Sequence, residues 1–415
     1  MKVLVLNCGS SSVKLQLVDV DARVADHEPL TVWARGAVHN VASPNATWSV
    51  DVGENHSEGA LRLRDHSSAV RELLARFREA YGDGAIDAVG HRIVHGGARY
   101  AEATVIDHAV VTSLTELEEL APLHNGPCVA GVRAARTALG DAVPMTASFD
   151  TTFHHDLPPV ASQYAIPASL AERYAIRRYG FHGLSYRSVL ARYCHLTDTP
   201  SERATLIVLH LGSGCSAAAI RDGRSADTSM GFTPLEGLVM STRSGDLDPA
   251  IVAFLAQHES TPAETVEQWL NTRSGLIGVS RSTGDMRELL AVERDDEHAR
   301  LAIEMFAYRA RKYVGSYLAA LGGADAVVLT GGIGENSPVV RTRILDGMEW
   351  CGIRLDSSCN SACVGAPARV SADDSRVAVY AIPTDEEGMI ARDAARLLSA
   401  SWGGLEHWRR QRDRL

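Results

Sequence analysis

Three turns rich in glycine and serine contain the residues of this sequence that are best suited to bind phosphate. The first places one glycine and three serines between Asn7 and Lys14. Backbone N–H groups and hydroxyls in a tight turn form a concave donor surface for an anion, and the lysine adds a compact positive charge. The segment lacks the GxxxxGK[ST] pattern of a Walker A loop. It is equally typical of an ordinary serine-rich hairpin turn, so on its own it leaves both interpretations open.

The second turn repeats the pattern of the first in the other half of the chain. An apolar strand over 206–211 runs into a Gly/Ser turn at 212–216, as the strand over 3–6 runs into the turn at 7–12. Such a repeat predicts a duplicated domain, in which each half offers one phosphate-binding tip to a shared cleft. Glycine-tipped hairpins are common, so coincidence is the alternative.

The third turn, 330–336, lies between an apolar strand at 326–329 and a helix that Ser337 and Pro338 are expected to begin. Its sequence is TGGIGEN. A strand, a glycine-rich loop and a helix form a setting in which backbone N–H groups contact a nucleotide. One GGxG motif is weak evidence, but with the two hairpins it predicts the third wall of a nucleotide cleft.

Three basic side chains are suited to stabilise the charge that develops during phosphoryl transfer. They are Arg92 in HRIVHGG, His182 in RRYGFHG and Arg243 in STRSGD. Guanidinium groups and an imidazole provide this stabilisation without a covalent step. The structural alternatives are a buried ion pair, a satisfied core histidine and a solvated surface arginine, respectively. Asp150 follows a strand predicted over 143–149, where ligands bind in open α/β sheets, although it could simply cap the next turn.

Glu386 and Glu387 follow the last predicted strand, 377–382. One of these carboxylates and the Asn7 amide could hold Mg²⁺, with water and phosphate oxygens completing its coordination. The alternative is that the two glutamates form the acidic first turn of the last helix, which the helix dipole favours.

Composition limits the possible functions further. The chain has 415 residues, of which 45% are hydrophobic and 22% charged, and this suits a globular protein of two domains. A net charge of −10 argues against a nucleic-acid partner. The longest apolar runs have strand length and no leader is recognisable, so we expect no membrane span and a cytoplasmic location. The seven scattered cysteines indicate reduced thiols, and Cys351, Cys359 and Cys363 lack the nearby histidine of a zinc site.

Hydrophobic periodicity and capping residues predict the elements that position these groups. Helices are expected over 67–81, 112–120, 127–139, 248–258, 296–321 and from 388. Further strands are expected over 13–17, 88–94 and 217–220. On the longest helix, Leu301, Met305 and Tyr308 fall on adjoining turns.

In this order, the motifs resemble the acetate kinase family, within the actin/Hsp70/sugar-kinase superfamily. The most specific blocks are VLNCGSSSVK at 5–14 and DTSMGFTPLEGLVMSTRSGDLDP at 227–249. The other matches are HRIVHGG, PLHNG, FDTTFHHDLP, RRYGFHG, HLGSG, GDMREL, TGGIGEN and PTDEEGMIARD. Together they span nearly the whole chain.

The resemblance implies an α/β fold of duplicated ribonuclease H-like domains of the actin-like ATPase type, with two lobes around a central nucleotide cleft. The N-terminal lobe would comprise 1–150 and the C-terminal helix 388–415, and the C-terminal lobe 151–387. Closure of the hinge would exclude water from the phosphoryl group. Family members are homodimers, so we expect a homodimer here.

The resemblance also implies residue roles. Asn7 and Glu386 would hold Mg²⁺ or Mn²⁺. The phosphates of ATP or ADP would contact Ser10, Ser12, Lys14, His210, Leu211, Gly212, Ser213 and Gly214. The nucleoside would contact Asp285, Met286, Arg287, Gly332, Ile333, Gly334, Glu335 and Asn336. The catalytic set would be Arg92, Asp150, His182 and Arg243, and the acyl group would meet Arg92, Val94, Leu123, Phe181 and Pro234.

The implied reaction is reversible, Mg²⁺-dependent and in-line phosphoryl transfer from ATP to acetate, giving acetyl phosphate and ADP. Acetate is already ionised at neutral pH, so we expect Asp150, the family's proposed acid/base residue, to orient groups or to engage the metal through water. Departures from the family pattern include Ser213 for asparagine, Ser241 for glycine and Asp385 for asparagine. They put rate, nucleotide preference and acyl-chain choice in doubt. The alternatives are a propionate or other short-chain fatty acid kinase, and a non-catalytic nucleotide-dependent clamp.

Overall fold

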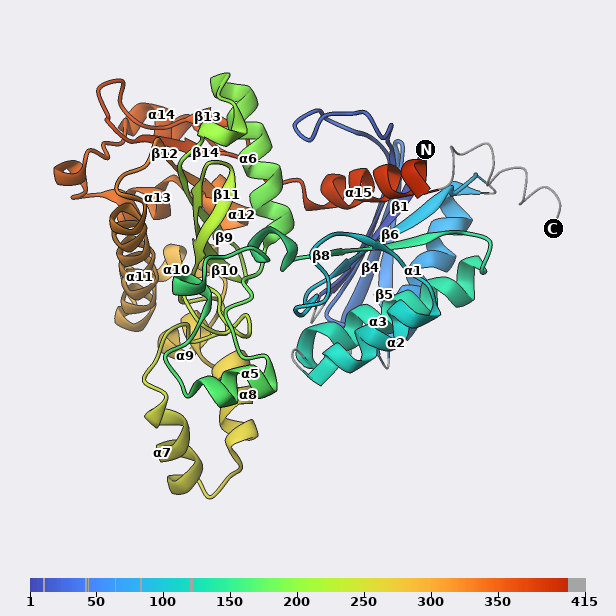
Figure 1. Cartoon of the computed structure of the whole chain (residues 1–415), viewed down its shortest axis with the longest axis horizontal. Coiled ribbons are helices and arrows are strands. Elements are labelled where there is room, and N and C mark those ends of the chain that lie inside the picture. Colours follow the sequence, from blue (N-terminus) through green and yellow to red (C-terminus); the bar gives the residue numbers. More distant parts are fainter. Residues whose placement is uncertain are drawn as a thin grey trace. The chain divides into compact units, whose positions relative to one another are not determined.

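A computed structural model of the chain describes residues 1–9, 12–41, 43, 45–63, 65–82, 84–119 and 122–401. These residues form two compact units (Figure 1). Unit 1 contains Met1–Thr152 and the described residues from Asp385 onward, whereas unit 2 contains Phe153–Thr384. Among the described residues, no helix is both long and apolar enough to cross a membrane.

Unit 1 is built on an eight-stranded mixed sheet with the order β5-β4-β3-β2-β1-β6-β8-β7. Its strands are β1 (Lys2–Cys8), β2 (Ser12–Asp19), β3 (Thr31–His39), β4 (Ala46–Val52), β5 (Asn55–Leu61), β6 (Ala88–Ile93), β7 (Thr104–Val105) and β8 (Met145–Phe149). The predicted first hairpin is confirmed, since β1 and β2 pair antiparallel with Asn7 opposite Lys14. β1, β6 and β8 are parallel to one another. Their carboxyl ends therefore meet at one edge of the sheet.

Helices cover both faces of this sheet. They are α1 (His66–Tyr81), α2 (His108–Glu116), α3 (Pro122–Leu139) and α15 (Glu386–Ser401). α1 begins at a capping box formed by Asp65 and Ser68. It packs Leu73 close to Gly36 of β3, whereas Ile390 of α15 lies against Gly90 of β6. The strand register places these two glycines on opposite faces, and Figure 1 shows α1 and α15 on opposite sides of the sheet.

Unit 2 repeats the central order of unit 1 in a six-stranded sheet, β11-β10-β9-β12-β14-β13. Its strands are β9 (Leu206–Leu211), β10 (Cys215–Arg221), β11 (Arg224–Thr228), β12 (Ala326–Thr330), β13 (Ala368–Arg369) and β14 (Ala378–Ala381). β9 and β10 form an antiparallel hairpin with His210 opposite Ser216, and β12 and β14 extend it in parallel. An antiparallel hairpin followed by two parallel strands is thus common to both units. This confirms the predicted α/β fold with duplicated domains.

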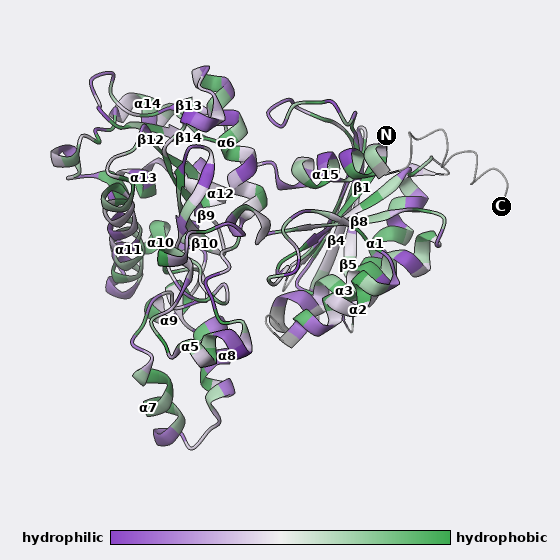
Figure 2. Ribbon diagram, viewed as in Figure 1, coloured by the Kyte–Doolittle hydropathy of each residue, from purple (hydrophilic) through white to green (hydrophobic). Residues whose placement is uncertain are grey.

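The helices of unit 2 are α4 (Pro159–Ser162), α5 (Ala168–Tyr174), α6 (Gly183–Thr197), α7 (Ala250–His258), α8 (Ala263–Thr272), α9 (Gly275–Ser280), α10 (Met286–Val292), α11 (Glu297–Leu321), α12 (Gly331–Asn336), α13 (Pro338–Leu345) and α14 (Ser357–Ala362). α11 begins after Asp296, whose carboxylate accepts from two backbone N–H groups, and ends at Gly322 in the left-handed region. Figure 2 shows hydrophobic residues along the strands and on part of each long helix.

Several sequence-based element predictions are wrong in detail. The helix predicted over 127–139 begins at Pro122, with Pro127 inside it. The helix predicted over 112–120 covers His108–Glu116, because Asp107 caps it earlier. The predicted glycine loop after β12 is the short helix α12. On α11, Leu301, Met305 and Tyr308 are exposed, whereas small residues of another face, such as Ala302 and Ala310, are buried against the sheet.

Candidate active site

In unit 1, Arg92 joins the ends of three parallel strands. Its Nε and Nη2 donate to the two carboxylate oxygens of Asp150 over 2.9 and 2.6 Å. Its Nη1 donates to Asn7 Oδ1 over 3.2 Å. Asp150 follows β8, as predicted, and its side chain is 2% exposed. Charge-assisted bidentate pairing of this kind fixes the plane of the guanidinium and the orientation of the carboxylate.

Glu386, at the start of α15, completes this cluster. Its Oε2 lies 3.9 Å from Arg92 Nε. Burial raises the pKa of Glu386 to about 7 despite the opposing effect of Arg92, and the carboxylates of Asp150 and Glu387 raise it further. Burial alone would lower the pKa of Arg92, but Asp150 and Glu386 raise it above its ordinary value. With the Asp150 and Glu386 carboxyl groups beside one guanidinium, the cluster has a surplus of acidic groups.

This surplus of acidic groups fits the predicted divalent ion. Asn7 and Glu386 offer the oxygen donors that Mg²⁺ prefers, and both lie beside the Arg92–Asp150 pair. The described residues contain no group of three or more His, Cys, Asp or Glu side chains arranged to hold a metal. A Mg²⁺ ion that keeps several waters and binds substrate phosphates does not need such a group.

Of the predicted phosphate ligands in unit 1, Lys14 is exposed on β2, opposite Asn7. Ser12 O accepts a hydrogen bond from the Gly9 N–H over 2.8 Å, which closes the turn. Ser10 lies outside the described residues. The structure thus brings Lys14 close enough to Glu386 to oppose the rise in the pKa of that carboxyl.

In unit 2, the predicted histidine and arginine meet at the second hairpin turn. A Cβ added to Gly214 would lie 3.5 Å from His182 Nε2 and 3.6 Å from Arg243 Nη1. The His182 ring stacks on His210, with their centroids 4.2 Å apart. The absence of a side chain at Gly214 leaves a space that an imidazole, a guanidinium and the turn all border.

Arg243 is held by the segment that precedes it, since its Nη1 donates to Pro234 O over 3.0 Å. That segment is fixed in turn by Glu236, which accepts from Arg178 Nη2 over 2.6 Å and from the Tyr164 hydroxyl. The Tyr164 oxygen accepts from the backbone N–H of Phe232 over 2.8 Å. A half-buried polar cluster therefore positions the loop behind Arg243.

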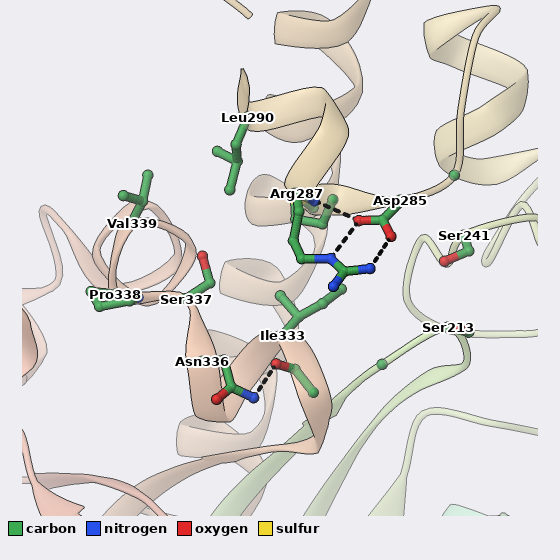
Figure 3. Close-up of a pocket in the computed structure, with 14 residues that line it drawn as sticks. Ser213, Ser241, Asp285, Arg287, Leu290, Ile333, Asn336, Ser337, Pro338 and Val339 are labelled. Atoms are coloured by element: carbon green, nitrogen blue, oxygen red, sulfur yellow. Dashed lines mark hydrogen bonds and ion pairs between the residues drawn. The ribbon is translucent and has the colours of Figure 1, made fainter. Parts of the chain in front are cut away.

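A pocket of about 850 Å³ in unit 2 brings together most of the predicted nucleoside ligands (Figure 3). Predicted residues in its lining are Gly212, Ser213, Asp285, Met286, Arg287, Gly332, Ile333 and Asn336. Asp285 caps α10 and accepts from Arg287 Nε and Nη2 over 3.1 and 2.6 Å. Arg287 lowers the pKa of the Asp285 carboxyl through these bonds. The pocket volume suits a small organic ligand of nucleotide size.

Two predicted nucleotide ligands point elsewhere. The Glu335 carboxylate accepts from the N–H groups of Gly331 and Thr384 over 2.8 and 3.1 Å, so it braces its own loop. Gly334 O accepts from Arg341 Nη1 behind the pocket. His210, Leu211 and Gly214 do not line the pocket but belong to the hairpin beside it.

Sequence reasoning missed other residues of the pocket wall. They are Ser241, Gly284, Leu290, Ser337, Pro338 and Val339. Figure 3 shows Ser213 and Ser241 at one end of the pocket and Pro338 and Val339 at the other. Ser337, Pro338 and Val339 could have been predicted from the helix start at Ser337-Pro338, because the first turn of α13 directly follows the glycine motif. The sequence around Leu290 gives no such signal, because an apolar residue within a helix is typical of an ordinary core position.

The predicted acyl-pocket residues are divided between the units. Val94 is buried in unit 1, whereas Phe181 and Pro234 are buried in unit 2. The side chain of Leu123 lies outside the described part of α3. The described apolar members of the set are therefore all buried.

Comparison with known proteins bears on what the Arg92 cluster of unit 1 and the pocket of unit 2 do. A family model described as the acetokinase family matches residues 2–392. The chain belongs to this family. Acetate kinases of Solibacter usitatus and Chloroherpeton thalassium are 46% and 44% identical to this acetokinase over 407 and 412 residues. These matches cover 96% and 95% of the chain and 98% and 99% of the relatives.

Solved structures agree with this assignment. Acetate kinase of Porphyromonas gingivalis is 38% identical, with a TM-score of 0.85 over 96% of this chain and 99% of that one. A propionate kinase of Francisella tularensis is 35% identical, with a TM-score of 0.86 over 94% and 98%. The predicted acetokinase family and its actin-like fold are therefore confirmed, and with them a phosphotransferase whose acceptor is a carboxyl group. The roles of single residues stay predictions.

Proposed function

We propose that this acetokinase catalyses the reversible transfer of a phosphoryl group from ATP to acetate, giving ADP and acetyl phosphate. The observation that carries the proposal is the similarity to acetate kinases over nearly the whole chain. The local geometry supports it, because one unit gathers an arginine, an amide and two carboxylates, and the other pairs a nucleotide-sized pocket with an imidazole and a guanidinium.

Arg92 binds the carboxylate of acetate in this proposal. Three of its five N–H groups donate to Asp150 and Asn7, which leaves two for an anion. Asp150 orients the guanidinium. Asn7 and Glu386 hold Mg²⁺ or Mn²⁺, which when bound neutralises charge on the β- and γ-phosphate oxygens.

In unit 2, residues 285–287 hold the nucleoside together with Gly332, Ile333 and Asn336, and the turn at 210–214 holds the phosphates. Lys14 of unit 1 is the further phosphate ligand that the resemblance implies. An acetate oxygen attacks the γ-phosphorus as the bond from that phosphorus to the ADP oxygen breaks. His182 and Arg243 donate hydrogen bonds to the equatorial oxygens, where charge develops. Since the nucleophile is already an anion, the step needs no general base.

The decisive assay traps acyl phosphate as its hydroxamate in the presence of ATP, Mg²⁺ and a panel of short acids. We expect acetate-dependent product with the native chain and a loss of at least about 10³-fold in kcat with Arg243→Ala, whose fold should be intact. Arg300→Ala, an exposed arginine of α11, is the matched control and should keep full activity. ATP binding without acid-dependent turnover would instead identify a nucleotide-dependent clamp. With ATP that is chiral at the γ-phosphorus, transfer should invert the configuration at that phosphorus. Net retention of configuration would exclude direct in-line transfer.

The similarity to a propionate kinase supports a second candidate, a kinase for propionate or another short-chain acid. A chain-length series of kcat/KM separates the two, because one methylene in an apolar pocket is worth about 1–3 kcal/mol. Val94→Ala should shift the preference toward longer acids if Val94 limits the pocket. An unchanged chain-length profile would remove Val94 from the acyl site.

We infer in addition that the chain forms a homodimer and works in the cytoplasm. Leu301, Met305 and Tyr308 expose 47%, 40% and 64% of their surface along one side of α11, and an apolar stripe of this kind is typical of an interface. The seven cysteines are free thiols, as a reducing compartment favours. Light scattering should give twice the chain mass, and Met305→Glu should reduce it to a monomer if this stripe is the interface.

A further inference from the structure

His182 precedes the first turn of α6 in a conformation that few residues adopt. Its φ of 59° lies in the left-handed region. Its ring is stacked on His210 at an angle of 22° between the planes. Backbone and stacking together fix the position of the imidazole. They leave open which ring nitrogen carries the proton in the neutral state.

Nδ1 of His182 lies at the end of a short chain of hydroxyl groups. Ser216 Oγ, on β10, is 2.8 Å from this nitrogen. Tyr186 OH, on α6, is 2.5 Å from Ser216 Oγ. His182 and Tyr186 are four residues apart, so they face the same side of the helix. Tyr186 and Ser216 are fully buried, which means that their hydroxyl groups must find partners within the protein.

The direction of these hydrogen bonds follows from counting donors and acceptors. Ser216 Oγ is the one acceptor that the described residues offer to the Tyr186 hydroxyl. Burial raises the pKa of Tyr186, so the group keeps its proton. If Ser216 donated to Tyr186 instead, the phenol hydrogen would be buried without an acceptor, at a cost of about 1–3 kcal/mol. Tyr186 therefore donates to Ser216. Ser216 in turn donates to His182, because a serine that accepted from both neighbours would leave its own buried hydrogen without an acceptor among the described residues.

A histidine that accepts at Nδ1 carries its single proton on Nε2. Nε2 is the nitrogen that borders Gly214 together with the guanidinium of Arg243. The two hydroxyls thus direct the N–H of His182 to the same side of the turn as the arginine. An imidazolium ring would have to donate from Nδ1, so Ser216 would accept from both neighbours and its own buried hydrogen would lose its acceptor.

We propose that Tyr186 and Ser216 are positioning residues that hold His182 in the tautomer with its proton on Nε2. The purpose assigned to this arrangement rests on the proposed function, in which His182 donates a hydrogen bond to the phosphoryl group during its transfer. In the other tautomer, Nε2 would present a lone pair to oxygens that are gaining negative charge. The relay keeps the ring in the donating form before ATP arrives, so no reorganisation is needed in the transition state.

The tautomer can be read directly, without turnover. Long-range ¹H–¹⁵N correlation spectra of the full chain labelled in its histidine rings distinguish the two neutral forms and the imidazolium, and His182→Gln identifies the signal. We expect the Nε2–H pattern for the native protein. A native Nδ1–H pattern or an imidazolium near neutral pH would overturn the proposal.

Two variants test the relay, and a third is its matched control. Ser216→Ala should mix the tautomers of His182 and lower kcat roughly tenfold to a hundredfold, the range typical of groups that orient a functional histidine, with KM for ATP unchanged. Tyr186→Phe should mix them as well. Ser225→Ala removes another buried serine hydroxyl from a histidine, 2.6 Å from His154 Nδ1, and should change neither the His182 spectrum nor kcat.

The outcomes separate this proposal from the assigned activity. If the native spectrum is as expected but no acid supports turnover, the tautomer assignment stands and the proposed function fails. If both relay variants keep the Nε2–H pattern and the native kcat, the relay does not set the tautomer and the proposal fails. Should one of them not fold, the other variant and the native spectrum still decide.

Discussion

Replacing Arg341 by methionine tests how the nucleotide pocket is held in shape. The guanidinium is 0% exposed and donates five hydrogen bonds. Its acceptors are Gly334 O, Glu335 O, Asn360 Oδ1, Asn360 O and Cys363 O, at 2.7 to 3.1 Å. None of these acceptors is a carboxylate, and burial lowers the pKa of the arginine. The side chain thus joins the back of α12 to the end of α14.

Methionine has a similar length but no donor, so the variant leaves these oxygens without their partner. A buried acceptor that loses its donor costs about 1–3 kcal/mol, and water will reach some of the five. Two that stay unsatisfied would cost about 4 kcal/mol, which is at the upper end for single substitutions. Amide hydrogen exchange in peptides covering residues 331–345 should accelerate by roughly 10³-fold, since about 1.4 kcal/mol corresponds to a factor of ten. KM for ATP should rise while KM for acetate stays unchanged.

Arg300→Met, on the exposed side of α11, is the matched control and should alter stability by less than about 0.5 kcal/mol. Arg341→Lys should fall between the two, because one ammonium cannot reach acceptors that lie around all the edges of the planar guanidinium. The reasoning would be refuted if Arg341→Met lowered the free energy of unfolding by less than about 1 kcal/mol and left amide hydrogen exchange unchanged. The five hydrogen bonds would then contribute little more than the same groups gain from hydrogen bonds to water.

Two further predictions concern the other charged centres. The folded-state pKa of Glu386, about 7, lies above its usual 4.5, so between these pH values the folded chain binds a proton that the unfolded chain has lost. Without metal, the free energy of unfolding should therefore fall as the pH rises from 4.5 to 7. Mg²⁺ affinity, followed by calorimetry, should fall about tenfold per pH unit below 7 and level off above it, and Glu386→Gln should remove this dependence. A Cβ at Gly231 would lie 1.8 Å from Glu236 Oε2, so Gly231→Ala should lower the free energy of unfolding by about 1–3 kcal/mol. Gly315 has open space around it, so Gly315→Ala should raise the free energy of unfolding slightly. Equal effects of the two alanines in denaturant titrations would contradict the packing described.

The two hairpins and the strand ends are predictable because local sequence determines them. A continuous apolar run followed by glycine and serine specifies both a buried strand and its turn, so the places of Asn7 and His210 follow without tertiary information. The Asp150 position follows in the same way from β8. These residues form the part of the candidate site that pattern alone could locate.

Other features depend on packing that no local pattern reveals. The polar strands β4 and β5 widen the first sheet although β5 is mostly exposed. α11 buries Ala302, Phe306 and Ala310 and exposes Leu301, so the apolar residues of its sequence do not all mark the buried face. An arginine in a polar helix suggests a surface residue, yet Arg341 is fully buried since backbone carbonyls from two segments, 334–335 and 360–363, converge on it. Carbonyl directions of this kind arise only when the chain has folded.

The duplicated topology also allows equivalent strand ends of the two units to be compared, and they differ in chemistry. Equivalent strand ends carry Asn7, Arg92 and Asp150 in unit 1, but His210 and the backbone of Gly331 in unit 2. Charged groups at the first set suit a small anionic acceptor and a cation, both of which need strong localised fields. A histidine ring and backbone amides at the second suit a polyphosphate, whose charge is spread over many oxygens. The shared framework, with its parallel strands ending at one edge in each unit, thus carries a charged cluster in unit 1 and a histidine with backbone amides in unit 2.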